Sequence, residues 1–434
     1  MAEMKNAALD TLLNVLKTSG ADAWEVTDKT EKGWEFYFIR HALDQHRAKN
    51  VEHVTVKVYQ MAEDGESIGF ASEEIAPTAS EQEIEKTVSD LAYRATLVKN
   101  RPFTLTPPSE EKAAEGKASD IADISADFIR AVSELPETEG EDINSYEIFV
   151  SDVIHRLITS TGIDETEHYP SSMIEVVVNA RREGHEIELY RNYESGSCDA
   201  AGLKRDLIKT MNYGRDRLIA EPTPVNGKID VLFSTDNACQ IYSYFSERMN
   251  AALVYRQMSD YEIGKSICDD FTGDKVTVKA LRELANSSEN HAFDEEGAVI
   301  RDTVMIEDGI AKQFVGGRMF SCYLGLENSF NPTNIEVTGG TRTEQELRTG
   351  KYLEAVEFSD FQVDEITGDI FGEIRLAYLH DGDKVVPVTG GSLSGSMNDF
   401  IGSMLMSKNS VQYNSMKIPA LTLLRNVTVT GADN

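Results

Sequence analysis

Residues 54–70, VTVKVYQMAEDGESIGF, contain the strongest local signal for the fold. Apolar and polar residues alternate from Val54 to Tyr59, which is typical of a β-strand with one buried face. The pair Asp64-Gly65 then predicts a tight turn into a second strand that includes Ser67–Phe70. The stretch therefore predicts a β-hairpin in the N-terminal region.

Helices are predicted on both sides of this hairpin. Four leucines at helical spacing between residues 9 and 16, followed by Gly20, indicate a helix that ends near the glycine. After the hairpin, Ser80 and Glu83 have the spacing of a capping box, which marks the start of another helix. With a further strand at Trp34–Phe38, the pattern of helix, meander and helix predicts an N-terminal α+β domain over residues 1–103.

The composition changes in the next segments. Residues 104–145 are acidic and contain Pro107-Pro108, but residues 121–135 keep the apolar spacing of a helix. We interpret residues 104–145 as an acidic linker that carries one amphipathic helix. Residues 146–225 combine hairpin signals with a predicted helix at 200–218, and form a middle α/β segment.

The last segment, residues 226–434, is predicted to be rich in strands. A strand at 229–233 precedes a predicted helix at 237–255, and after about residue 269 glycines separate short β-like runs. The fold class predicted from sequence is therefore α+β, with an N-terminal helix–meander–helix domain and a glycine-rich, β-dominated C-terminal domain.

The charge excludes some classes of partner. The chain of 434 residues has 42 basic and 74 acidic side chains, so its formal net charge is −32. Such a surface repels phosphate groups, so we expect neither direct nucleic-acid binding nor an anionic membrane as a partner. The sequence shows no leader segment and no apolar run of membrane-spanning length, and its four cysteines are widely separated. These features predict a cytoplasmic protein with reduced cysteines.

Several motifs that resemble catalytic or nucleotide-binding sites fail on inspection. His185-Glu186 begins like a zinc-protease helix, but no histidine follows at the required spacing and the alternating residues predict a strand. His41 and His46 are five residues apart, and no glutamate follows His41 to act as a base. The run Gly264-Lys265-Ser266 has Ser259 where a phosphate-binding loop requires glycine.

The most unusual local run is Thr389–Gly395, TGGSLSG. Glycines can let a backbone approach a ligand, and consecutive amides can hold an oxyanion; the favoured alternative is a tight turn between strands. The residues proposed to line a peptide cleft are Arg375, Gly390, Gly391 and Ser392.

Several runs, in this order, resemble the TldD/PmbA family, whose members are described as metallopeptidases and as modulators of DNA gyrase. The runs are FDEEGA (293–298) with IEDG (306–309), NPTNI (331–335), TGDIFGEIR (367–375), PVTGGSLSG (387–395), and PAL (419–421) before VTVTG (427–431). The N-terminal pattern of helix, meander and helix fits the family more weakly.

The resemblance also implies where a metal site would be. The TldD type has a His-Glu-x-x-x-His motif on a helix after a strand, and a later cysteine completes the ligands. When the motif is aligned on the preceding strand, Val231–Phe233, its three positions correspond to Ser243, Tyr244 and Arg248. The region where the later cysteine would lie, residues 405–416, contains no cysteine. The chain is thus similar to the PmbA type, also called TldE, and we expect no metal, no other cofactor and no catalytic residue.

The resemblance implies a metal-free subunit of a cytoplasmic peptidase that acts on unfolded peptides with a TldD-type catalytic partner, and a homodimer when the partner is absent. Because family members are described as metallopeptidases, whether this chain is itself an enzyme stays open. One alternative is an acidic interaction protein that modulates DNA gyrase by imitating the charge of DNA. Another is a self-sufficient hydrolase with a non-metal site near Gly390 and Arg375.

Overall fold

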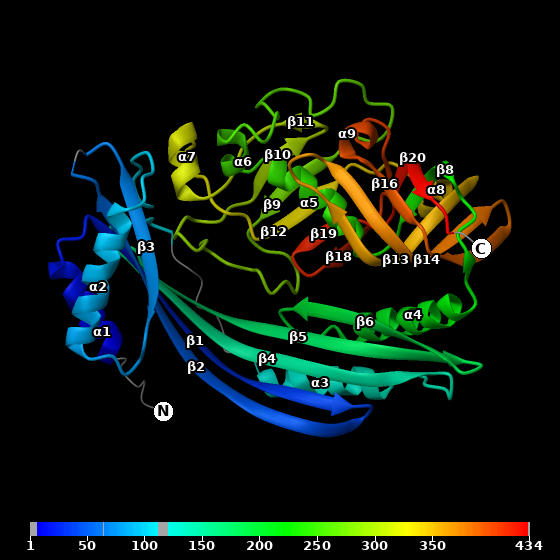
Figure 1. Cartoon of the computed structure of the whole chain (residues 1–434), viewed down its shortest axis with the longest axis horizontal. Helices are drawn as coiled ribbons and strands as arrows, with labels where there is room; N and C mark the ends of the chain where they lie inside the picture. Colours follow the sequence, from blue (N-terminus) through cyan, green and yellow to red (C-terminus); the bar gives the residue numbers. More distant parts are fainter. Residues whose placement is uncertain (1–6, 64, 112–119, 433–434) are drawn as a thin grey trace.

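A twisted antiparallel sheet of six long strands forms the N-terminal part of the chain (Figure 1). The computed structural model describes residues 7–63, 65–111 and 120–432. The strands lie in the order β3-β2-β1-β4-β5-β6. Their bounds are β1 (Ala23–Ile39), β2 (Ala42–Met61), β3 (Ile68–Ile75), β4 (Glu141–Thr159), β5 (Asp164–Arg182) and β6 (His185–Ser195).

This sheet joins strands from both sides of the predicted linker. β1 pairs with β4 continuously from Glu25–Thr159 to Ile39–Ser145. Residues of the predicted N-terminal domain and of the predicted middle segment therefore share one sheet, and β4 begins at Glu141, within the range predicted as linker. The hairpin of β2 and β3 forms as predicted, with Val54 opposite Ile75; Asp64 of its turn lies outside the described residues.

Four helices cover one face of the sheet, at two separate ends. α1 (Ala7–Thr18) and α2 (Glu81–Thr96) pack over the β2–β3 end, and α3 (Ile121–Ser133) and α4 (Ala200–Leu218) pack over the other end. Even-numbered residues of β4 and β5 such as Ile148 and Val176 point to the helices and are fully buried. Within the described ranges, no helix combines the length and apolarity that a membrane span needs.

The C-terminal part is built around a closed barrel. β8 pairs with β13 and β20, β20 with β16, β16 with β14, and β14 returns to β13, so the ring has no open edge. Short strands β7, β15 and β17 extend it. The bounds are β7 (Glu221–Pro222), β8 (Gly227–Phe233), β13 (Lys351–Val363), β14 (Asp369–Asp381), β15 (Lys384–Thr389), β16 (Ser392–Ser396), β17 (Leu405–Met406) and β20 (Thr422–Thr430).

A second, smaller sheet packs against the barrel through a shared apolar core. Its strands are β11 (Ile310–Ala311), β10 (Thr303–Glu307), β9 (Thr277–Leu281), β12 (Asn334–Thr338), β19 (Met416–Pro419) and β18 (Ser410–Tyr413), in that spatial order. The helices of this part are α5 (Ala238–Arg248), α6 (Ala251–Tyr255), α7 (Arg318–Leu324), α8 (Glu344–Leu347) and α9 (Met397–Phe400). The predicted α+β class with a β-dominated C-terminal part is confirmed.

One predicted helix is divided in two. The pattern at 237–255 predicts a single helix, but α5 ends at Arg248, and Asn250 has an extended backbone and accepts a hydrogen bond from the amide of Ala252. An asparagine that can cap a new helix competes with helix continuation, which explains the break. The helix predicted at 200–218 and the strand predicted at His185-Glu186 are both confirmed.

Candidate functional site

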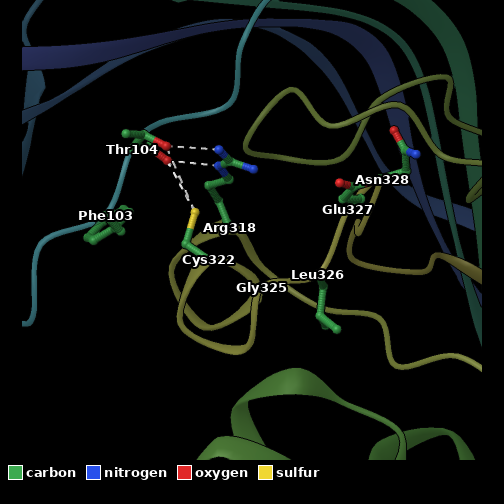
Figure 2. Close-up of a pocket in the computed structure, with 8 residues that line it drawn as sticks. All are labelled: Phe103, Thr104, Arg318, Cys322, Gly325, Leu326, Glu327 and Asn328. Atoms are coloured by element: carbon green, nitrogen blue, oxygen red, sulfur yellow. Dashed lines mark hydrogen bonds between the residues drawn. The ribbon is translucent and has the colours of Figure 1, made fainter. Parts of the chain in front are cut away.

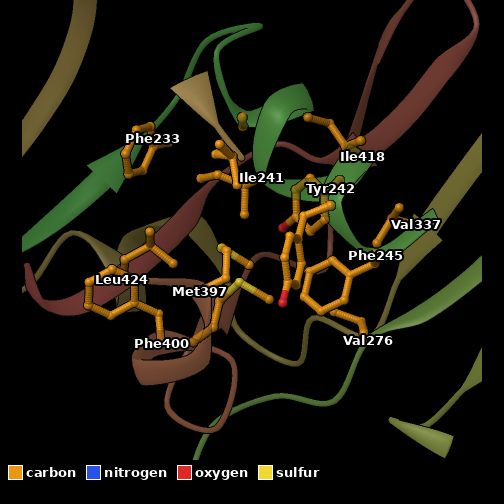
Figure 3. Close-up of a cluster of buried hydrophobic side chains, with 14 of the residues drawn as sticks. Phe233, Ile241, Tyr242, Phe245, Val276, Val337, Met397, Phe400, Ile418 and Leu424 are labelled. Atoms are coloured by element: carbon orange, nitrogen blue, oxygen red, sulfur yellow. The ribbon is translucent and has the colours of Figure 1, made fainter. Parts of the chain in front are cut away.

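Helix α5 runs through the core of the C-terminal part, between the barrel and the smaller sheet. Figure 3 shows Ile241, Tyr242 and Phe245 of this helix among the apolar side chains of both layers. The hydroxyl groups of Tyr242 and Thr422 lie 2.6 Å apart, which ties α5 to β20. Helix α5 is therefore tied into the core, and the same helix carries the three positions where the family resemblance places metal ligands.

Ser243 and Tyr244 have contacts that belong to a folded core. The Ser243 hydroxyl donates to the sulfur of Met416 at 3.6 Å. Tyr244 is only 1% exposed, and its hydroxyl donates to Asn398 Oδ1 at 3.4 Å. Burial raises the pKa of the Tyr244 hydroxyl, so this group stays protonated near neutral pH.

Arg248 supplies a fixed positive charge at the third position. Its side chain is 7% exposed, and Nη1 donates to the carbonyl oxygens of Met258, at 2.8 Å, and Ile366, at 2.9 Å. Nη2 donates to the carboxylate of Asp260. The guanidinium also lies 5.6 Å from the ring centre of Tyr244 and 5.3 Å from that of Tyr261. Arg248 therefore joins three segments: α5, residues 258–261 and the turn before β14.

These three positions do not fit a zinc ion. Zinc is bound by thiolate, imidazole or carboxylate groups, whereas this site offers a neutral hydroxyl, a protonated phenol and a guanidinium that would repel a cation. In the ranges that the structure describes, no three or more His, Cys, Asp and Glu side chains are grouped so that they could hold a metal. Cys239, in the first turn of α5, is half-buried, and desolvation raises the pKa of its thiol to about 12, which disfavours a reactive thiolate.

The residues predicted to line a peptide cleft come together at one turn of the barrel. Gly390 and Gly391 connect β15 to β16 with φ of 76° and 79°. The Gly390 amide donates to the Ile374 carbonyl, and the Gly391 carbonyl accepts from the Ile374 amide, both at 3.0 Å. Ser392 pairs with β14 and β20, and Arg375 of β14 forms an ion pair with Glu373 at 3.3 Å. These contacts support the turn between strands that was the favoured alternative.

Replacing Gly391 with alanine tests whether this turn has a structural role. A β-carbon at Gly391 would lie 2.2 Å from the carbonyl oxygen of Thr430, whereas Gly382, which also has a positive φ, has open space around it. We expect G382A to cost about 1 kcal/mol of unfolding free energy from backbone strain, and G391A about 2 kcal/mol more from overpacking. Urea denaturation of both variants measures this difference. Equal losses in the two variants would contradict the close approach of Gly391 to Thr430 of β20.

Two neighbouring pockets lie in the C-terminal part, beside the loop that follows α7. The first, of about 630 Å³, is bordered by Phe103 and Thr104, where the predicted linker begins, and by α7 with its following loop (Figure 2). The second, of about 500 Å³, shares residues 325–328 with it. In the first pocket, Arg318 donates to the carbonyl and hydroxyl oxygens of Thr104, at 2.8 and 2.9 Å. Its charged group is thus engaged in attaching the linker to α7. The sequence offers no signal for either pocket.

The loop FDEEGA connects the two parts of the molecule. Asp294 is buried, and its carboxylate accepts hydrogen bonds from the amides of Glu296, Ala298 and Asn331, at 2.8 to 3.0 Å. Burial raises the pKa of Asp294 to about 6. Just before it, His291 lies 3.3 Å from a carboxylate oxygen of Glu167 on β5. The Asp294 contacts hold this family-like run together, and the neighbouring His291 contact joins the C-terminal part to the sheet.

The fold and this site define a class: a two-part α+β protein whose C-terminal part encloses helix α5 between a closed barrel and a smaller sheet. Residues 226–431 match the family described as "PmbA/TldA metallopeptidase C-terminal domain". The "Metalloprotease PmbA homolog" of Haemophilus influenzae is 23% identical over 214 residues, which are 47% of this chain and 46% of that protein, so the match spans about half of its length. Residues 226–431 therefore form a C-terminal domain of the TldD/PmbA family.

Solved structures show the same fold over nearly the whole chain. TldE from Thermococcus kodakarensis has a TM-score of 0.77 and 14% identity, and the match covers 98% of this chain and 100% of that one. A candidate modulator of a DNA gyrase from Thermotoga maritima has a TM-score of 0.76 and 15% identity, covering 97% and 99%. A candidate modulator of DNA gyrase from Bacteroides thetaiotaomicron has a TM-score of 0.78 and 16% identity, covering 100% of both chains.

Proposed function

We propose that this chain is a metal-free subunit of the PmbA/TldE type, which works in the cytoplasm with a TldD-type catalytic partner on unfolded peptides. The observation that carries this proposal is Arg248. A buried guanidinium, bound by two carbonyl oxygens and a carboxylate, lies where the resemblance places a metal-binding histidine. A chain with this arrangement needs another polypeptide to supply the metal and the attacking water.

The test compares the purified chain alone and with a TldD-type protein. We expect below about 0.1 zinc per isolated chain by elemental analysis, since a structural or catalytic site would hold about one. We also expect no cleavage of an unfolded peptide such as casein fragments by the chain alone, and cleavage that rises when both proteins are mixed. A chelator should abolish the cleavage without dissociating the complex in size-exclusion chromatography.

Other outcomes distinguish the alternatives. Stoichiometric zinc in the isolated chain, or failure to associate with the TldD-type protein, would refute the proposed role. Cleavage by the isolated chain in a chelator would instead indicate a self-sufficient hydrolase. A homodimer in the absence of the partner is compatible with the proposal, because a surface that fits a related chain can also fit its own copy.

The second candidate function is an acidic protein that acts on DNA gyrase. Two of the similar structures are described as candidate modulators of this enzyme, and the net charge of −32 could occupy a basic DNA-binding groove. Binding to gyrase at low salt that disappears near about 200 mM salt would support this function. Absence of binding at low salt would exclude it.

A further inference from the structure

One face of the N-terminal sheet is not covered by helices, and its side chains form two rows across five strands. The first row is Gln45, Tyr37, Glu147, Glu175 and Asn192, and the second is Arg47, Glu35, Phe149, Met173 and Glu194, in the order β2-β1-β4-β5-β6. Each residue is directly opposite the next in the strand register. All ten side chains are half-buried or exposed, and we call them the open face.

The open face is acidic. It holds four carboxylates and one guanidinium, so its net charge is −3. Glu147 and Glu175 are directly opposite each other on neighbouring strands, and like charges in such a pair destabilise a sheet. Partial burial, and next the charge of Glu175, raise the pKa of Glu147. A positively charged binding partner would relieve the repulsion between these two carboxylates.

The aromatic residues show how a cation can bind here. The rings of Tyr37 and Phe149 meet edge to face, with their centres 5.9 Å apart, between the carboxylates of the two rows. The chain's own Arg47 already lies over the Tyr37 ring at 4.9 Å and 3.9 Å from Glu35. A guanidinium or ammonium group from another molecule can bind in the same way, against an aromatic ring and close to the carboxylates of Glu147 and Glu175.

We propose that the open face binds a cationic, extended polypeptide segment through its lysine or arginine side chains. Five strands spaced about 4.8 Å apart give a surface about 19 Å wide, enough for several residues of an extended chain. Nucleic acids and anionic membranes would be repelled, and a second copy would bring a face of the same charge. This binding goes beyond the proposed function, because it requires neither a catalytic partner nor cleavage.

Fluorescence anisotropy with a labelled peptide of alternating lysine and glycine tests this site, at about 50 mM salt to limit screening. Because the whole chain is acidic, the control must remove equal charge elsewhere. We expect E147Q/E175Q to weaken binding about tenfold, and E81Q/E85Q, on the exposed surface of α2, about twofold or less. Y37L should weaken binding about threefold by removing one of the two rings that lie between the carboxylates.

Two results would overturn the proposal. Equal weakening by both double variants would show that the peptide binds through diffuse electrostatics, and equal binding of a peptide with glutamine in place of lysine would exclude recognition of charge. Thermal unfolding provides a second readout: E147Q/E175Q should be at least as stable as the parent chain, since it removes the repulsion between the two carboxylates. A less stable E147Q/E175Q chain would show that these carboxylates are structural.

Discussion

Replacing Arg248 with alanine is expected to lower the free energy of unfolding by about 2–4 kcal/mol, because it removes three hydrogen bonds from a buried charged donor. The substitution removes the donor to the carbonyl oxygens of Met258 and Ile366, and also the partner of Asp260. Lysine at this position should restore only part of the loss, because an ammonium group cannot reproduce the fork of the guanidinium. Urea denaturation of R248A and R248K measures both effects.

An arginine on the surface provides the matched control. Arg94 forms one ion pair with Glu73 at 2.8 Å, and its side chain is 50% exposed. We expect R94A to change the free energy of unfolding by less than about 1 kcal/mol. If R248A were as stable as R94A, the guanidinium would not be the group that joins α5 to its neighbouring segments, and the structural argument against a metal at this position would fail.

The second large expected effect is a loss of stability at high pH, which arises at the contact between the two parts of the molecule. His291 is 15% exposed and lies between Glu167, at 3.3 Å, and Glu289, at 3.7 Å. Although burial alone would lower it, hydrogen bonds and charge interactions with these two glutamates raise the pKa of His291 to about 9. The stability from this raised pKa is fully present below pH 6.5 and is lost as the pH rises through 9. The loss amounts to about 3 kcal/mol.

The comparison of parent and H291Q isolates this contribution, because other groups that titrate above pH 8 affect both proteins equally. We expect the difference in unfolding free energy to shrink by about 3 kcal/mol between pH 6 and pH 10. His155 provides a contrasting control, since burial lowers its pKa. For H155Q, the difference from the parent should change only as the pH falls below 6.5. A difference for H291Q that is constant from pH 6 to 10 would contradict the pairing of His291 with Glu167 and Glu289.

Local patterns predicted many individual elements correctly. The hairpin of β2 and β3, helix α4 and the strand that begins at His185 follow from residue periodicity and turn residues, because these signals lie within a few positions of one another. The pairing of β1 with β4 could not be predicted in the same way. Periodicity indicates which face of a strand is buried, but it does not identify the neighbouring strand more than a hundred residues away.

The sequence places the three candidate positions on a helix, and their correspondence to metal ligands stays a prediction. Register from the strand before α5 identified Ser243, Tyr244 and Arg248, and the structure places all three on α5 beside the barrel. The partners of Arg248 could not be found from sequence, because Met258 and Ile366 contribute only backbone oxygens, which any residue possesses. The open face also depends on register across five strands, so the two rows of side chains become visible only when the sheet is assembled.

The closure of the barrel has a consequence for biosynthesis. β8 obtains its neighbour β20 from residues that follow roughly 190 positions later, with Phe233 opposite Thr422. During translation, the six-stranded sheet can assemble while β8 still lacks both of its hydrogen-bonded neighbours. The nascent chain must therefore keep an apolar strand from pairing with other molecules until the ribosome has delivered β20, and this interval is when chaperone assistance and aggregation compete most directly.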